Sequence, residues 1–190
     1  MQRRVAVLFA REDSIYKTMP DCDVWDIKRN ALNWPGGMPI VAHPPCRLWG
    51  RLRTFANVIT GEKELAPWAV EQVRKFGGVL EHPYKSTLWD AMSLPHPGII
   101  DKFQGWTIAI PQFWFGHKAY KRSWFYIVGV GPYHIPPVPL VMGDAEFVIQ
   151  TRKRKDHRPH VPKADREHTP LKLAEWLLEV ARRSERCEVL

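Results

Sequence analysis

The residue of this chain best suited to covalent chemistry is Cys46, which closes the run His43-Pro44-Pro45-Cys46. Two consecutive prolines cannot continue a strand ladder, so we expect the thiol on a rigid loop just past a short strand. The positive potential of nearby arginines would favour the thiolate, which is the nucleophilic form. The sequence therefore predicts a reactive thiol, with a buried structural cysteine as the alternative. The arginines that follow Cys46 are Arg47, Arg51 and Arg53.

A second chemical group, Glu81, ends an apolar run and precedes His82. Burial raises the pKa of a carboxyl group that has no partner, and such an acid can donate a proton near neutral pH. The alternative is a carboxylate that caps a helix or pairs with an arginine. His43, Cys46 and His82 could also begin a metal site, but no second ligand pair at zinc spacing is visible, so no metal is expected.

The basic character of the chain predicts a polyanionic partner, because its 190 residues carry a net charge of +8. Trp49 and Phe55 lie among the arginines after Cys46 and could stack on unpaired bases, although core packing is the expected role of both. Solubility is the alternative reason for the excess charge. Further nucleic-acid contacts are expected from Lys118, Lys121, Arg152 and Arg154.

Length and cysteine content indicate one domain in a reducing compartment. We expect a core over residues 1–150, with a basic segment and a closing helix over 151–190 that packs back on it. Three cysteines cannot build a disulfide framework, which favours the cytoplasm. No apolar run approaches the ~20 residues of a membrane helix, so no membrane partner is expected.

Secondary structure must position these groups, and the hydrophobic pattern alternates between strands and helices. Helices are predicted over residues 62–76 and from Pro170, with Thr169 as N-cap and with Leu171, Ala174, Leu178 and Ala181 facing the core. Strands are predicted over residues 5–9, 22–27, 38–42, 79–82 and 124–128.

This alternation predicts an α/β fold, with a mostly parallel sheet and helices on both faces. Ligands of such sheets bind beyond the carboxyl ends of the strands. Asp26, Cys46 and Glu81 would all fall at that edge.

In chain order, several segments resemble the motifs of cytosine-C5 DNA methyltransferases. The run that ends in Cys46 is similar to the Pro-Cys nucleophile loop of that family, and residues 77–83 resemble its strand ending in Glu-Asn. Residues 116–129 resemble the basic segment before a strand that ends in Val-Gly, and residues 166–170 resemble its Arg-x-x-Thr-Pro element. The same reduced motif set is similar to short phage-encoded proteins, which would place this chain in an infected bacterial cytoplasm.

The resemblance implies a Rossmann-like, methyltransferase-like fold and methyl transfer to C5 of a cytosine flipped out of DNA. Cys46 would add to C6 of the ring, Glu81 would bind N3, and Arg122 would steady the adduct. S-adenosylmethionine would be the methyl donor. Its binding residues would be Phe9, Asp26 and Pro44.

Two departures from the family pattern bear on function. The turn over residues 10–16 contains no glycine, and its side chains would narrow the cofactor cleft. The target-recognition domain is missing or reduced to residues 132–163, so specificity is expected to be low or supplied by a protein partner. Two other functions stay open: a non-catalytic nucleic-acid-binding protein with this fold, and an enzyme acting on free pyrimidine nucleotides.

Overall fold

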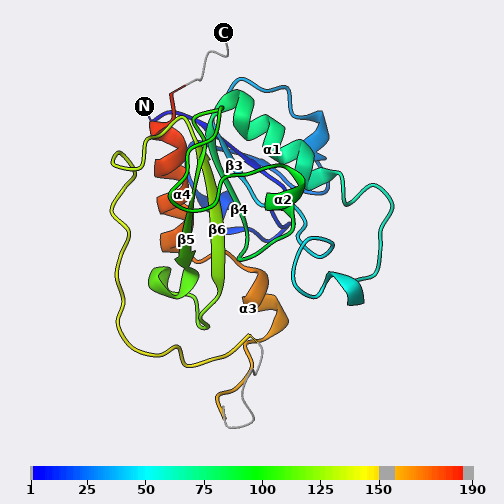
Figure 1. Cartoon of the computed structure of the whole chain (residues 1–190), viewed down its shortest axis with the longest axis vertical. Coiled ribbons are helices and arrows are strands. Elements are labelled where there is room, and N and C mark those ends of the chain that lie inside the picture. The colour runs from blue at the N-terminus through cyan, green and yellow to red at the C-terminus, as the bar shows by residue number, and fades with distance from the viewer. Residues whose placement is uncertain (1, 150–156, 186–190) are drawn as a thin grey trace.

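Six strands form one mixed sheet in the computed structural model, which describes residues 2–149 and 157–185 (Figure 1). Their order across the sheet is β2-β1-β3-β4-β6-β5. Arg152 and Arg154 lie outside the described residues. The strands are β1 (Val5–Leu8), β2 (Cys22–Trp25), β3 (Ile40–Ala42), β4 (Gly78–Pro83), β5 (Trp106–Pro111) and β6 (Arg122–Val128).

The sheet is mostly parallel, as predicted, but it contains one reversed strand. Strands β2, β1, β3 and β4 run parallel, and β6 pairs antiparallel with both β4 and β5. Because β6 is reversed, its first residues lie at the edge where β4 ends. The α/β class is therefore confirmed, and the sheet is mixed.

Strand β5 was not predicted, because its burial pattern lacks the alternation that marks a strand in sequence. Its two terminal pairs are buried, whereas Ile108 and Ala109 in its middle are partly or largely exposed. The second predicted strand ends at Trp25 rather than at residue 27. It ends there because the Asp26 side chain accepts hydrogen bonds from the backbone amides of Lys28 and Arg29, which turns the chain.

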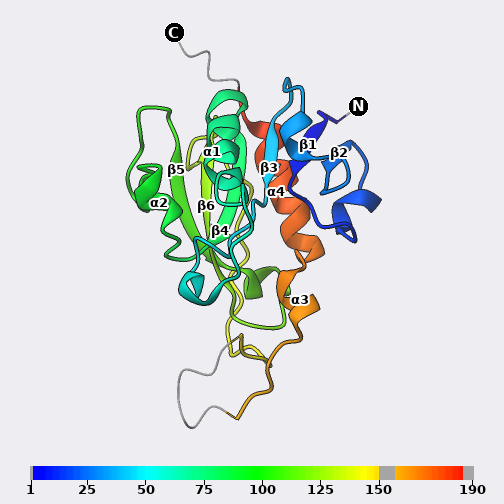
Figure 2. The same cartoon turned by 90° about the vertical axis from the view of Figure 1, so that its right-hand side faces the viewer.

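Helices cover both faces of the sheet, α1 (Leu65–Phe76) on one and α4 (Leu171–Arg183) on the other (Figure 2). Successive residues of a strand point to opposite faces. Val5 and Val7 of β1 therefore join the cluster around α4, whereas Ala6 and Leu8 join the cluster around α1. Both faces being buried explains why β1 is a continuous apolar run.

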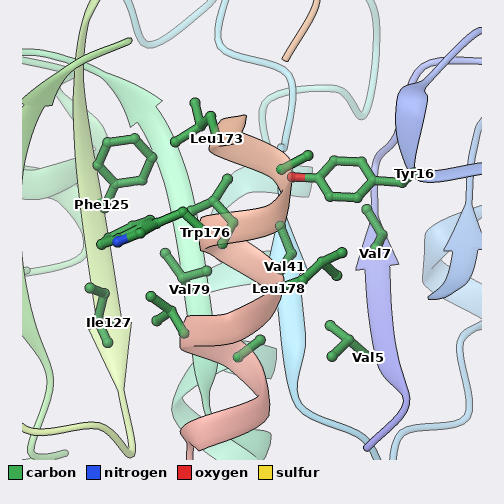
Figure 3. Packing of buried hydrophobic residues seen from close by; sticks show 14 of the residues in the cluster. Val5, Val7, Tyr16, Val41, Val79, Phe125, Ile127, Leu173, Trp176 and Leu178 are labelled. Carbon is green, nitrogen blue, oxygen red and sulfur yellow. The ribbon is translucent and has the colours of Figure 1, made fainter. Parts of the chain in front are cut away.

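Helix α4 fills one layer of the core, and Figure 3 shows Trp176 between Phe125 and Val79. Its start differs from the prediction. The carbonyl of Pro170 accepts the first helical hydrogen bond, from the amide of Ala174 at 2.9 Å, so Pro170 and not Thr169 occupies the N-cap position. Leu171 is 51 % exposed and does not face the core, whereas Ala174, Leu178 and Ala181 are buried as predicted.

Two glycines turn the chain from α1 into β4. Gly77 ends the helix with φ 76°, a backbone conformation that side chains disfavour. A Cβ on Gly78 would lie 2.0 Å from the carbonyl oxygen of Ile40. Glycine at both positions therefore lets β4 begin directly against β3.

Short helices complete the fold, and no described helix has both the length and the apolar character needed to cross a membrane. Helix α3 lies near the edge where β4 ends and β6 begins (Figure 2). The short helices are η1 (Ile15–Thr18), η2 (Ala31–Asn33), η3 (Arg53–Phe55), α2 (Leu88–Ala91), η4 (Gln112–Phe115) and α3 (Lys163–Glu167).

Candidate active site

The carboxylate of Glu81 is the centre of a polar cluster at the carboxyl edge of the sheet. Its Oε1 accepts hydrogen bonds from Ser123 Oγ at 2.5 Å and from Gln112 Nε2 at 3.0 Å. Its Oε2 lies 3.3 Å from His43 Nδ1. The side chain is only 12 % exposed, so β3, β4, β6 and η4 together fix its position.

The partners of Glu81 decide between the two alternatives that the sequence left open for its pKa. Desolvation by burial raises the pKa of this carboxyl group, but the charge of Lys121 and the hydrogen bonds from His43 and Ser123 outweigh it. The pKa of Glu81 is therefore lowered, as for the paired carboxylate that the sequence left open, although its partners are His43, Ser123 and Lys121 and not an arginine. At neutral pH the group is an ionised acceptor and does not itself carry a proton to donate.

Cys46 is exposed on the loop that follows β3. Its carbonyl oxygen accepts hydrogen bonds from the amides of Trp49 and Gly50 at 3.1 and 2.8 Å, which folds the chain into a tight turn. Enough protein surrounds the thiol that desolvation raises its pKa, and the charge of Glu81 raises it further. The prediction that the thiolate is favoured is therefore wrong in this conformation.

The cation that acts on this thiol is Lys121, whose charge lowers the pKa of both Cys46 and Glu81. Arg47, in contrast, places its Nε 2.9 Å from Glu62 Oε2. An exposed thiol, a fixed carboxylate and one lysine thus act on one another at this edge of the sheet.

Arg122, the cation expected to steady an adduct, begins β6 and is exposed. Its guanidinium lies 5.5 Å from the ring centre of Tyr84 and 5.7 Å from that of Tyr120. Alternate residues of a strand point to opposite faces. Because Ser123 points toward Glu81, its neighbour Arg122 points to the other face.

An open pocket of about 220 Å³ lies beside Arg122, and Ser123 is the one member of the Glu81 cluster among its lining residues. Three aromatic side chains and one guanidinium give it surfaces that suit a flat, polar ring. Its lining residues are Tyr84, Ala109, Ile110, Pro111, Trp114, Tyr120, Arg122 and Ser123.

The residues expected to bind S-adenosylmethionine lie at the ends of β1, β2 and β3, but other residues of the protein already contact or bury them. Phe9 has φ 59°, as a glycine turn would, and its ring packs edge-on against Trp68 at 5.8 Å. Asp26 accepts hydrogen bonds from Lys17 Nζ and from two backbone amides, which uses three of about four lone-pair sites. Pro44 is buried.

Charged side chains bridge the turn after β1, where the family pattern has glycines. Arg11 contacts Asp13 at 2.9 Å and Glu167 at 2.6 Å. His168 Nε2 lies 3.2 Å from Asp13 Oδ2. These contacts tie the turn to the segment before α4. The described residues therefore fit the methyl donor only in part: Asp26 keeps one free lone-pair site, and the turn is closed by ion pairs.

The basic residues expected to bind nucleic acid are not equivalent. Arg51 and Arg53 are exposed on the loop over residues 47–64, whereas Lys118 pairs with Asp165 at 2.7 Å. The two aromatic residues of this loop also differ. Trp49 is buried, as expected, but Phe55 is 85 % exposed, so its expected core role is wrong.

Sequence reasoning missed four members of the cluster: Tyr16, His43 as a partner of Glu81, Gln112 and Ser123. His43 carried a local signal, its proximity to Cys46, but was considered only as a metal ligand. Tyr16 and Gln112 reach the cluster through tertiary packing and carry no signal in their own segments. Among the described residues, no three His, Cys, Asp or Glu side chains are placed to hold a metal ion.

Comparison with known proteins adds no identification: no family model matches the chain, and no curated protein matches it.

Proposed function

We propose that this chain is an enzyme that modifies a cytosine in DNA, with Cys46 as the nucleophile and a methyl group at C5 as the product. One observation carries the proposal. The exposed Cys46 thiol follows the strand that pairs with the strand of Glu81, with Ala42 opposite Leu80, and His43 of the same loop lies 3.3 Å from the largely buried Glu81 carboxylate. A thiol and a carboxylate at one strand edge are the pair needed for attack on a pyrimidine ring.

In the proposed reaction the Cys46 thiol gives its proton to water, and the resulting thiolate adds to C6 of the ring. The ionised Glu81 accepts a hydrogen bond from the exocyclic amine of the cytosine, which holds the ring in place. Lys121 stabilises the negative charge that the ring acquires on addition. When bound, S-adenosylmethionine would supply the methyl group. Water then takes the C5 proton, the electrons of the C5–H bond re-form the C5–C6 double bond, and the C6–S bond breaks to release the thiolate.

The topology of the sheet supports a methyltransferase-like fold. A reversed strand, β6, is inserted between β4 and the edge strand β5 of an otherwise parallel sheet. An open, mostly parallel sheet with helices on both faces is the Rossmann-like arrangement. The Cys46 loop, the Glu81 strand and the closing helix α4 also follow one another in the order of that family.

The loop over residues 47–64 supports DNA as the partner. It leaves the sheet immediately after Cys46 and projects from the body of the molecule (Figure 1, cyan). Its two exposed arginines, Arg51 and Arg53, flank the exposed Leu52, and the exposed Phe55 follows two residues later. Cations next to an exposed aromatic ring suit phosphates and unstacked bases together.

Mass spectrometry of nucleosides from the DNA of cells that express the protein tests this proposal. We expect 5-methylcytosine in excess of the level in cells that lack the protein, with the excess abolished by Cys46→Ser. Cys22→Ser is the matched control, because Cys22 is half-buried beside α4 and should leave the product unchanged. No change in any pyrimidine nucleoside would overturn the proposal.

A non-catalytic DNA-binding protein is the second candidate, and the ion pairs of Arg11 favour it. They hold charged side chains in the turn where the methyl donor would lie. This candidate predicts DNA binding with no modified nucleoside, and binding that Cys46→Ser leaves intact.

A further inference from the structure

Three side chains from separate elements form a hydrogen-bonded chain that ends at Glu81. The hydroxyl of Tyr16, in η1, lies 3.1 Å from His43 Nε2. His43 follows β3, and its other ring nitrogen, Nδ1, lies 3.3 Å from Glu81 Oε2. Tyr16 is 1 % exposed, and Figure 3 shows its ring beside α4, next to Val7.

The positions of the protons in this series of hydrogen bonds follow from Glu81 at one end and Tyr16 at the other. Glu81 is ionised and can only accept, so His43 Nδ1 must carry a proton. Burial raises the pKa of Tyr16 well above its usual value, so the hydroxyl keeps its proton. A hydroxyl can donate to an unprotonated Nε2 and can turn to accept from a protonated one. The Tyr16 hydroxyl can therefore hydrogen-bond to His43 whether or not Nε2 carries a proton.

We propose that His43 and Glu81 share one transferable proton beside Cys46, and that Tyr16 is the positioning residue that keeps His43 directed at Glu81. The use of this proton rests on the proposed function. An ionised Glu81 can accept a hydrogen bond from the exocyclic amine of a cytosine but cannot donate one to the ring nitrogen N3. His43 is the neighbour that can protonate Glu81.

The step is a proton transfer within the pair. In the imidazolium form of His43, the Nδ1–H bond breaks and an Oε2–H bond forms on Glu81. His43 becomes neutral with its remaining proton on Nε2, and the Tyr16 oxygen accepts that hydrogen bond. A bound cytosine that excludes water from this edge of the sheet would favour the transfer, because desolvation favours the neutral forms of His43 and Glu81.

The groups that face this pair come from every neighbouring element. The titratable ones are Lys121, Cys46, His82 and Tyr16, and Lys121 favours the ionised Glu81. Ser123 and Gln112 are neutral donors to the oxygen that His43 does not contact. A ligand that draws Lys121 away from Glu81 would therefore promote the transfer as well.

Nitrogen-15 NMR of the histidine side chains tests the arrangement without DNA or a methyl donor. We expect neutral His43 to carry its proton on Nδ1 in the wild type, and to shift toward the Nε2 form in Glu81→Leu, which removes the acceptor oxygen. The His43→Gln variant assigns the signal. A wild-type His43 with its proton on Nε2, or a tautomer that Glu81→Leu leaves unchanged, would overturn the proposal.

The Tyr16→Phe variant tests the positioning role in the same NMR measurement. In the wild type the hydroxyl can donate to the unprotonated Nε2 of neutral His43. We therefore expect Tyr16→Phe to raise the fraction of His43 that carries its proton on Nε2. A tautomer distribution equal to that of the wild type would contradict the role of Tyr16. Since no DNA is involved, this failure differs from absence of DNA modification.

Discussion

At the scale of single residues, two opposite charges act on one thiol. Desolvation by burial raises the pKa of Cys46, the charge of Glu81 raises it further, and the charge of Lys121 lowers it. The thiol is therefore largely protonated in the free protein, and its reactivity depends on what a ligand does to these neighbours.

Removing either charge should change the alkylation rate of Cys46 in opposite directions. We expect Glu81→Gln to accelerate alkylation at pH 7.5 about five-fold, which corresponds to ~1 kcal/mol of lost repulsion, and Lys121→Gln to slow it. Iodoacetamide labelling followed by peptide mass spectrometry measures both. A Glu81→Gln rate equal to or below the wild-type rate would show that the two groups do not interact.

His82 makes the fold sensitive to acid. It is fully buried, its Nδ1 lies 2.7 Å from Ser86 Oγ, and burial lowers its pKa to about 4. The unfolded chain, with an ordinary pKa of 6.5 at this residue, binds more protons between these two values. Stability therefore falls as the pH falls from 6.5 toward 4.

Urea unfolding at pH 7 and pH 4.5 measures this loss, which we expect to be on the order of 2–3 kcal/mol from His82 alone. His82→Asn should flatten the dependence in this window even if it lowers stability at pH 7. His117, whose pKa burial also lowers, accounts for part of the remaining slope. Glu81 contributes only below pH 4.5, because its pKa is lowered from that value. An unchanged slope in His82→Asn would contradict the assignment.

At the scale of elements, the sequence was informative where structure is local. The apolar run before His43 and the run before His82 predicted strand ends, and parallel strands bring their ends to one edge. Cys46 and Glu81 could therefore be placed together. The direction of β6 is set by its partners β4 and β5, so the choice between Lys121 and Arg122 could not be made from their own segment.

The burial of a side chain by segments far away in the sequence could not be predicted from its own segment either. Whether Glu81 has a raised or a lowered pKa depends on His43, Ser123 and Lys121, which come from three parts of the chain. Trp49 and Phe55 are both aromatic residues of one loop, and only contacts with the α1 layer distinguish the buried one from the exposed one.

The exposed loop should contribute to nucleic-acid affinity through Phe55. Stacking of a base on an aromatic ring is worth about 1–3 kcal/mol, so we expect Phe55→Ala to weaken binding of single-stranded DNA at least about five-fold. The thermal midpoint should not change, because the side chain is 85 % exposed. Fluorescence anisotropy with a labelled oligonucleotide measures the effect.

Ile27→Ala is the matched control for that measurement, since Ile27 is 80 % exposed and lies after β2, outside this loop. Arg53→Gln should reduce the salt dependence of binding by about one counterion, because one phosphate contact is lost. Equal affinities of Phe55→Ala and the wild type would remove the loop from the interface.

At the scale of the whole molecule, α4, near the C-terminus, packs in the same core cluster as β1, near the N-terminus. Trp176 of α4 packs against Phe115 and Phe125, and its Nε1 donates to the carbonyl of Pro136 at 3.0 Å. Arg3 also donates to the carbonyl of Ser184. The strands that carry the candidate site therefore depend on α4 for one of their two covers.

Trp176→Ala should cost about 3–5 kcal/mol of unfolding free energy, because it opens a large cavity in this layer. Leu171→Ala, at an exposed position of the same helix, should change stability by less than about 1 kcal/mol. Urea denaturation of the two variants provides the comparison. A loss of the same size in both would mean that α4 is not held through its buried face.

Covalent trapping tests most directly whether Cys46 attacks a cytosine in DNA. The protein is incubated with S-adenosylmethionine and a duplex that contains 5-fluorocytosine, whose C5 substituent cannot leave as a proton does. We expect a complex that survives denaturation and maps to the Cys46 peptide. It should be absent in Cys46→Ser and reduced in Glu81→Gln. DNA that is bound but never trapped, or a complex that persists in Cys46→Ser, would contradict the account.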